Sequence, residues 1–99
     1  QLDSHPEIDG VFSTDTIVSY AIKYILEKGK KIPDDYIIVG YDGVDISNYV
    51  YPSLSYVRQP FEKLADTIVD VLLRKINGEN LTDDVVVNDV RYIAGNTTR

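Results

Sequence analysis

The sequence predicts an α/β fold built around a parallel sheet. Short apolar segments alternate along the chain with longer segments whose apolar residues recur at helical spacing. One apolar segment, residues 36–41, is hydrophobic at nearly every position, as expected of a parallel strand covered on both faces. The first strand, the first helix and this second strand fit within residues 10–41, the length of a right-handed βαβ unit.

The first expected strand is Gly-Val-Phe-Ser at residues 10–13, and a helix follows it. Residues 14–16, Thr-Asp-Thr, supply the helix start because Thr and Asp are favoured at that position. Lys28 falls in the last turn, and Gly29 is placed as the left-handed stop. The apolar residues at helical spacing between these ends are Ile17, Val18, Ala21, Ile22, Ile25 and Leu26.

The second strand is expected at residues 36–41 and a third extended segment at residues 54–59. Pro60 suits the first turn of a second helix, which ends at Asn77-Gly78. The apolar stripe of this helix consists of Phe61, Leu64, Ala65, Ile68, Leu72 and Ile76.

A last strand is expected at residues 85–93. The tail after it, residues 94–99, is polar and short, so we expect it to fray.

Composition excludes several classes of function. The net charge of −6 argues against direct gripping of a phosphate backbone, because that binding requires Lys and Arg to neutralise phosphates. The chain has no Cys, which excludes disulfides, thiolate chemistry and a Cys-based zinc site. No apolar run is long enough to span a membrane. Because the chain starts at Gln1 and contains no Met, we expect it to be a piece of a longer protein.

Two acids occupy comparable positions, each directly after a predicted strand. Asp42 follows the second strand and precedes Gly43, so it is either part of an Asp-Gly turn or a ligand group at a strand end. Asp15 follows the first strand at the helix start, where it is either a helix cap or a second ligand group. Thr14 is an alternative cap. Both acids are expected at one edge of the sheet, because parallel strands end there together.

Other polar residues give no catalytic or metal site. His5, the one histidine, lies in the polar segment 3–9 and is interpreted as part of a solvated loop, since no second His or Cys stands at metal-ligand spacing. Ser13 lacks the pattern of a nucleophile elbow, and no glycine-rich phosphate loop is present. We expect no enzyme, no metal and no cofactor.

Tyr49 and Tyr51 lie near Ile46 and Val50, which predicts a partly apolar surface after the second strand. Such a surface is either covered by chain that is absent here or used for association, and we favour association.

Four segments, in order, resemble the lactose/galactose-repressor (LacI/GalR) family of bacterial transcription regulators. They are GVFSTDTIVSYAI, KIPDDYIIVGYDG, YPSLSYVRQP and VVVNDVRYIAGNT. The third is the most specific, because its Pro, Leu, Val, Gln and Pro all fall in register. The chain departs from the family at Thr14, where members usually carry Asn or Ser, at Gly43 and at Ala94.

The resemblance implies part of a type I periplasmic-binding-protein-like fold, in which two α/β subdomains enclose an effector cleft. Residues 1–59 and 82–99 would belong to the C-terminal subdomain, and residues 60–81 would form a helix that packs in the absent N-terminal one. The whole protein would be a cytoplasmic repressor. It would bind operator DNA only through an absent N-terminal headpiece, and its effector would be a sugar or a sugar phosphate. The alternative is a periplasmic sugar-binding receptor of a transport system, which shares this fold.

The resemblance also implies roles for particular residues. Asp42 matches the family's cleft acid, and Thr14, Asp15, Gln59 and Phe61 match positions around the cleft. The family dimerises through the helix at residues 16–28 and the loop after the cleft acid. This assigns a homodimer interface to Ile22, Ile46, Tyr49 and Val50.

Overall fold

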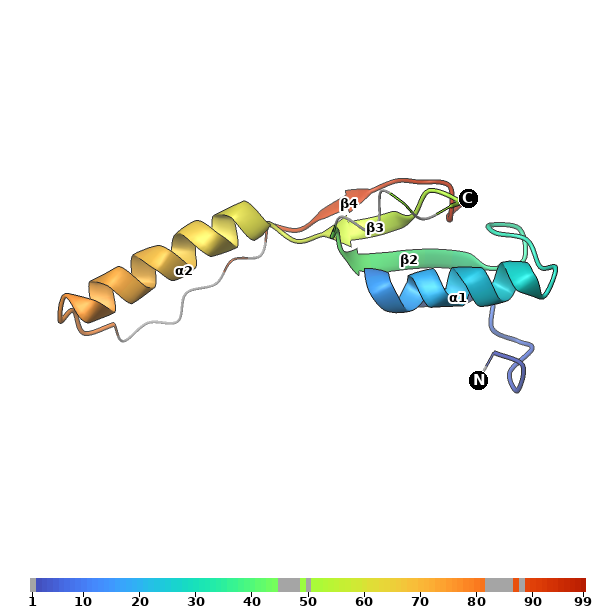
Figure 1. Ribbon diagram of the computed structural model, residues 1–99, viewed down its shortest axis with the longest axis horizontal. Coiled ribbons are helices and arrows are strands. Elements are labelled where there is room, and N and C mark those ends of the chain that lie inside the picture. Colours follow the sequence, from blue (N-terminus) through green and yellow to red (C-terminus); the bar gives the residue numbers. More distant parts are fainter. Residues whose placement is uncertain (1, 45–48, 50, 82–86, 88) are drawn as a thin grey trace.

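The computed structural model describes residues 2–44, 49, 51–81, 87 and 89–99. The described residues form one sheet and two helices (Figure 1). In chain order the elements are β1 (Gly10–Thr14), α1 (Asp15–Glu27), β2 (Ile37–Asp42), β3 (Ser55–Arg58), α2 (Phe61–Ile76) and β4 (Arg91–Ile93).

The sheet has the strand order β1-β2-β3-β4. The first three strands are parallel, which confirms the predicted βαβ unit, whereas β4 pairs with β3 in the antiparallel direction. The last strand is shorter than predicted: residues 87, 89 and 90 are not strand, and the ladder occupies only Arg91–Ile93. Residues 82–86 and 88 of that prediction lie outside the described residues.

Helix α1 packs on one face of β1 and β2 and forms the core. Its buried side chains are Val18, Ile22 and Ile25, which meet Ile38 of β2 and Leu54 just before β3. The helix ends where the sequence predicted, because Gly29 adopts a positive φ of 77°. Lys28 is the C-cap residue rather than a member of the last turn.

The C-terminal tail is part of the sheet's support, so the expectation that it frays was wrong. Thr97 is fully buried, and its hydroxyl donates to the Ile38 carbonyl oxygen at 2.7 Å. The Thr97 hydroxyl oxygen accepts a hydrogen bond from the Ser55 backbone N–H at 2.8 Å, and the Thr97 carbonyl oxygen accepts one from the Ile38 N–H at 2.9 Å. The tail therefore bridges β2 and the start of β3, and each bond satisfies a buried polar group.

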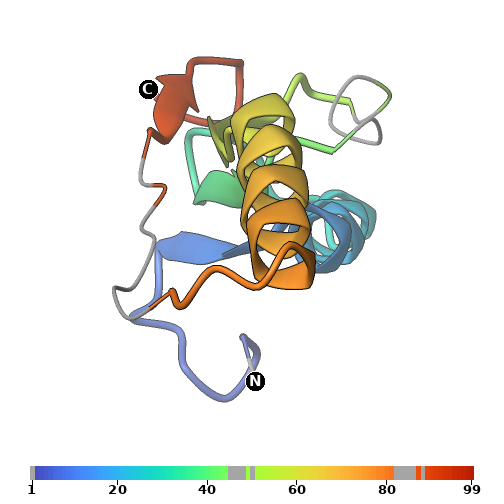
Figure 2. The same cartoon turned by 90° about the vertical axis from the view of Figure 1, so that its left-hand side faces the viewer.

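Helix α2 extends away from the sheet along the long axis of the molecule (Figures 1 and 2). The radius of gyration is 18.1 Å, well above the ~13 Å of a compact domain of this length. No residue of α2 is buried. Its uncovered apolar side chains include Ile68, Val69, Leu72, Leu73 and Ile76. Within the described part of the chain, neither helix is long and apolar enough to cross a bilayer.

Candidate functional site

Asp42 is the last residue of β2 and makes two contacts with Gln59, which follows β3. Its Oδ1 accepts a hydrogen bond from Gln59 Nε2 at 2.5 Å, and its carbonyl oxygen accepts one from the Gln59 backbone N–H at 2.9 Å. The parallel register makes this possible, because Asp42 pairs with Arg58, one residue before Gln59. Both side chains are half-buried. The sequence prediction of an acid at a strand end is therefore confirmed.

The backbone at Asp42 is strained. Its φ is 129°, a left-handed conformation that glycine adopts easily and other residues rarely do. Strain of this kind costs on the order of 1–3 kcal/mol and is concentrated at functional sites. Gly43 follows with φ 77°, and a Cβ there would come within 2.6 Å of Arg58 Cγ. Gly43 thus makes the turn, whereas Asp42 keeps a carboxylate at a position where glycine would be less strained.

Asp15 supports the loop after β2, and the interpretation of it as a helix cap was wrong. Its Oδ2 accepts hydrogen bonds from Gly43 N–H at 2.8 Å and Val44 N–H at 3.0 Å. Thr14 occupies the N-cap position of α1, but its side chain makes no capping hydrogen bond. Asp15 is fully buried: in this conformation it holds the loop after Asp42 and does not face solvent. Its role in effector binding stays a prediction.

The burial of Asp15 depends on Gly40. A Cβ at Gly40 would collide with the Asp15 carboxylate and would lie 2.8 Å from a Leu54 methyl carbon. The glycine of the apolar strand therefore makes room for the acid of the neighbouring helix. Nothing in the sequence around either residue indicates this contact, because they are 25 positions apart.

Thr14 and Phe61 lie at the same end of the sheet as Asp42. Thr14 ends β1 and is the register partner of Tyr41, and its side chain is exposed. Phe61 is the first residue of α2, two positions after Gln59, and is 38% exposed. The fold thus gathers a hydroxyl, a carboxylate and an amide at the ends of three consecutive strands, with an aromatic residue beyond. The roles of these residues in binding stay a prediction.

The Asp42–Gln59 bond determines which atoms are left for a ligand. A carboxylate only accepts hydrogen bonds, so the Gln59 NH₂ group must be the donor and the amide oxygen Oε1 points elsewhere. Among the described residues, no group is bonded to Asp42 Oδ2 or to Gln59 Oε1. These two acceptors, together with the Thr14 hydroxyl, suit a ligand that donates several hydrogen bonds, as a polyhydroxy compound does.

Sequence reasoning missed the aromatic contact on the open face of the sheet. Phe12 and Tyr41 project from β1 and β2 on the face opposite α1, and their rings meet edge to face with centroids 6.1 Å apart. Phe12 is 65% exposed. The alternation of strand residues places Thr14 on this same face, two positions after Phe12. The periodicity of β1 is the signal that would have grouped them.

The structure places Ile22, which was assigned to the predicted dimer interface, in the core of the chain. This residue is only 2% exposed and belongs to the core, because it lies on the face of α1 that packs on the sheet. The outer face of α1 instead exposes Ile17 and Tyr20. Tyr49 is 84% exposed, whereas Ile46 and Val50 lie outside the described residues. A role for Tyr49 in association stays a prediction.

No group of three His, Cys, Asp or Glu residues that could hold a metal ion occurs in the described part of the chain. His5 is exposed and lies 3.2 Å from Glu7, in the polar loop that the sequence predicted for it.

Comparison with known proteins places these observations in a family. Residues 1–98 match the family of periplasmic binding protein-like domains. A ribose operon repressor from Halalkalibacterium halodurans is 41% identical over 81 residues, which cover 81% of this chain and 24% of that repressor.

Two solved structures share the fold. A periplasmic binding protein/LacI transcriptional regulator from Alkaliphilus metalliredigens, complexed with D-xylulofuranose, is 34% identical with a TM-score of 0.85, covering 92% of this chain and 35% of that one. A complex of the regulator CelR with cellobiose is 26% identical with a TM-score of 0.88, covering 97% of this chain and 30% of that one. The chain thus spans between 24% and 35% of the length of these proteins.

Proposed function

The chain belongs to the family of periplasmic binding protein-like domains in the form found in LacI-type regulators, and from this membership we propose that it is the effector-binding and dimerisation part of a cytoplasmic transcriptional repressor. The observation that carries the proposal is the Asp42–Gln59 pair at the carboxyl end of the parallel strands. Ligands bind at this edge in open α/β sheets. Operator DNA would be bound by another part of the whole protein, since this part carries a net charge of −6.

The effector we propose is a sugar. Asp42 Oδ2, Gln59 Oε1 and the Thr14 hydroxyl supply acceptors for hydroxyl groups, and Phe12 and Phe61 supply apolar surface for the carbon face of a sugar ring. The relatives support this class: one is a ribose operon repressor, and two structures hold D-xylulofuranose and cellobiose.

In the proposed mechanism, effector binding changes the balance between two arrangements of the subdomains. Residues 1–59 and 82–99 would form part of one subdomain, and α2, within residues 60–81, would pack in the other. The exposed apolar side of α2 supports this division, because such a stripe requires a partner. Gln59 lies in the crossover, the short segment between β3 and α2 at which the chain passes from one subdomain to the other. A ligand that binds Gln59 therefore acts directly on this crossover. An effector shifts the equilibrium only by its difference in affinity for the two states.

The alternative of a periplasmic sugar receptor has less support, because the relatives described above are regulators and repressors. The sequence upstream of this chain in the whole protein distinguishes the two. A helix-turn-helix segment there fits the repressor, and a signal peptide fits the receptor.

The experiment that tests the function uses the whole protein and its operator. We expect Asp42→Ala to abolish the change in operator affinity that an active sugar produces, while operator affinity without sugar stays at the wild-type level. Asp34→Ala is the matched control, because Asp34 is exposed in the loop before β2 and its side chain makes no hydrogen bond with any described residue. An Asp42→Ala protein that still responds to the sugar would overturn the site assignment.

A further inference from the structure

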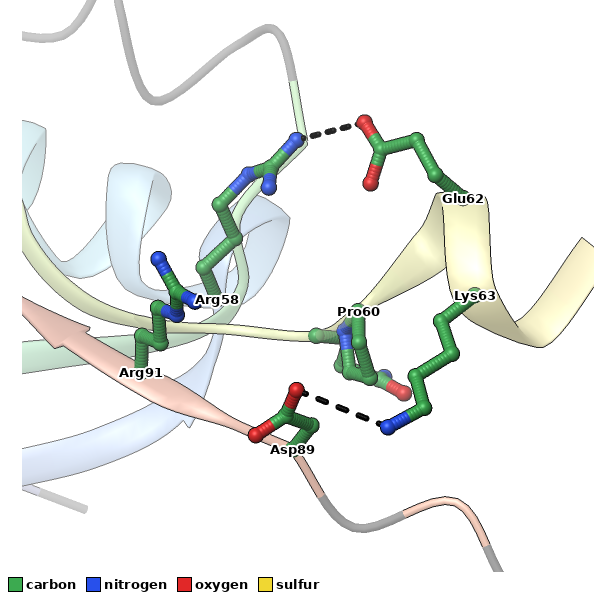
Figure 3. A pocket seen from close by; sticks show the side chains of 7 residues that line it. Arg58, Pro60, Glu62, Lys63, Asp89 and Arg91 are labelled. Carbon is green, nitrogen blue, oxygen red and sulfur yellow. Dashed lines mark hydrogen bonds and ion pairs between the residues drawn. The ribbon is translucent and has the colours of Figure 1, made fainter.

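We propose that Arg58 and Arg91 form a second binding site, for a small anion of the phosphate class, separate from the site at Asp42. Arg58 ends β3 and Arg91 begins β4, and the two are direct partners in the antiparallel register. Side chains directly opposite in such a ladder share one face, with Cβ atoms about 4.5–5.5 Å apart. Figure 3 shows both side chains projecting to the same side of the two strands.

This arrangement brings together two positive charges that are only partly compensated. Like charges directly opposite each other destabilise a strand pair. Arg58 Nη2 donates to Glu62 Oε1 at 3.0 Å, but Arg91 has no ion pair with any described residue. The chain contains sixteen acidic and ten basic residues. A shortage of acidic residues therefore does not explain why a second arginine, rather than an acid, stands opposite Arg58. A bound anion between the guanidinium groups removes the repulsion.

A cavity of about 240 Å³ lies beside the pair (Figure 3). Lys63 adds a third cation to its lining, and Glu62 and Asp89 are its two carboxylates, which leaves one positive charge in excess. Lys63 is 3.6 Å from Asp89. The volume is below the ~300–1,000 Å³ of sites that enclose drug-sized ligands, so it fits a group of phosphate size. Guanidinium forks match phosphate oxygens in geometry as well as charge.

The proposed anion site and the Asp42 site use different side chains of one short segment. Gln59 contributes to the cavity lining, but its NH₂ group is bonded to Asp42, which is not among the lining residues. The cavity is lined by β3, by β4 and by the first turn of α2. An anion held there by Arg58, Arg91 and Lys63 therefore joins the sheet to α2 at the crossover.

The test is a calorimetric titration of the whole chain with inorganic phosphate at constant ionic strength, so that screening does not change during the titration. We expect saturable binding that sulfate competes for. Arg91→Glu converts the like-charge pair into an ion pair, so this variant should fold at least as stably as the wild type and lose about tenfold or more in phosphate affinity. Lys30→Glu, in the exposed loop after α1, makes the same change in charge and should keep the wild-type affinity.

The site is refuted if phosphate does not bind saturably, if Arg91→Glu binds as the wild type does, or if both variants lose affinity equally. The last result would mean that overall charge is responsible. A second titration, with glucose 6-phosphate, distinguishes two sources of the phosphate group. If glucose 6-phosphate binds more tightly than inorganic phosphate, the ligand is a phosphorylated metabolite; if the two bind equally, the ligand is the free ion. In either case the Arg91→Glu variant must lose affinity.

Discussion

At the scale of single residues, the end of β2 depends on contacts made far along the chain. Asp42 carries a candidate acceptor oxygen, Gln59 orients its other carboxylate oxygen, and Asp15 holds the following loop through two backbone N–H groups. Gly40 leaves the space in which the Asp15 carboxylate is buried. The position of the candidate ligand group thus depends on a helix residue, Asp15, and on a strand residue, Gly40.

Gly40→Ala tests this dependence. A Cβ at position 40 meets the Asp15 carboxylate and Leu54, so we expect destabilisation by about 1–3 kcal/mol, as measured by urea unfolding. Gly10→Ala is the matched control, because a Cβ there meets only the Ile37 carbonyl oxygen at the ordinary distance of 3.9 Å. Equal stability of the two variants would show that Asp15 is not packed against Gly40.

Thr97→Val tests the role of the tail. Valine has the same shape as threonine but leaves the Ile38 carbonyl and the Ser55 N–H without their buried partner. We expect a loss of about 1–3 kcal/mol in the free energy of unfolding. Thr98→Val should cost less, because the partners of Thr98 are the hydroxyl groups of Ser55 and Tyr92, which can rotate toward other acceptors. A tail that only frays would show no effect in either variant.

At the scale of elements, the strands and helices were largely predictable and their side-chain contacts were not. Five of the six elements lie where periodicity and caps placed them, because a βαβ unit shows in the local pattern of apolar residues. The sequence also predicted that Asp42 lies at a strand end, because an acid directly after an apolar strand interrupts the apolar pattern. The contact of Asp15 with the loop after β2 was not predicted, because helix capping alone is enough to explain an Asp at a helix start. Thr97 was missed because its partners, Ile38 and Ser55, are distant in sequence.

The N-terminal segment is joined to α1 by a hydrogen bond from the Tyr24 hydroxyl to Asp3. This bond, with the negative charge of Asp3, raises the pKa of Tyr24 above its ordinary value of 10.0. Because the pKa is raised in the folded state, the stability that the bond provides is present below pH 10 and is lost as the pH rises through the folded pKa.

We expect Asp3→Asn to lower the Tyr24 pKa toward 10.0, as measured by ¹³C NMR titration of the tyrosine rings. Asp9→Asn, which changes the same charge at the end of the segment, should leave the Tyr24 titration unchanged. A Tyr24 pKa that does not respond to Asp3→Asn would mean that the segment does not dock on α1.

At the scale of the whole molecule, both helices leave apolar surface uncovered. These surfaces are the side of α2 that includes Ile68, Leu72 and Ile76, and the outer face of α1 with Ile17 and Tyr20. Exposed apolar surface of this extent marks association sites. We expect the 99-residue chain to self-associate in sedimentation measurements at high concentration.

Two variants assign the association to a surface. If α2 is responsible, Leu72→Glu should make the chain monomeric, whereas Tyr20→Glu should have little effect; the reverse result would assign it to α1. Leu72 is 55% and Tyr20 is 70% exposed, so neither change disturbs the core. A wild-type chain that stays monomeric throughout would contradict the prediction.

The central claim is that Asp42 and Gln59 act together as the sugar-binding pair. It is tested most directly by a double-mutant cycle in the whole protein, in which calorimetry measures the affinity for D-ribose, D-xylulose or cellobiose, whichever binds the wild type. We predict that Asp42→Ala and Gln59→Ala each lower the affinity by about tenfold or more, and that the double variant loses less than the sum of the two free-energy changes, because the residues are hydrogen-bonded to each other. Wild-type affinity in both single variants would contradict the claim.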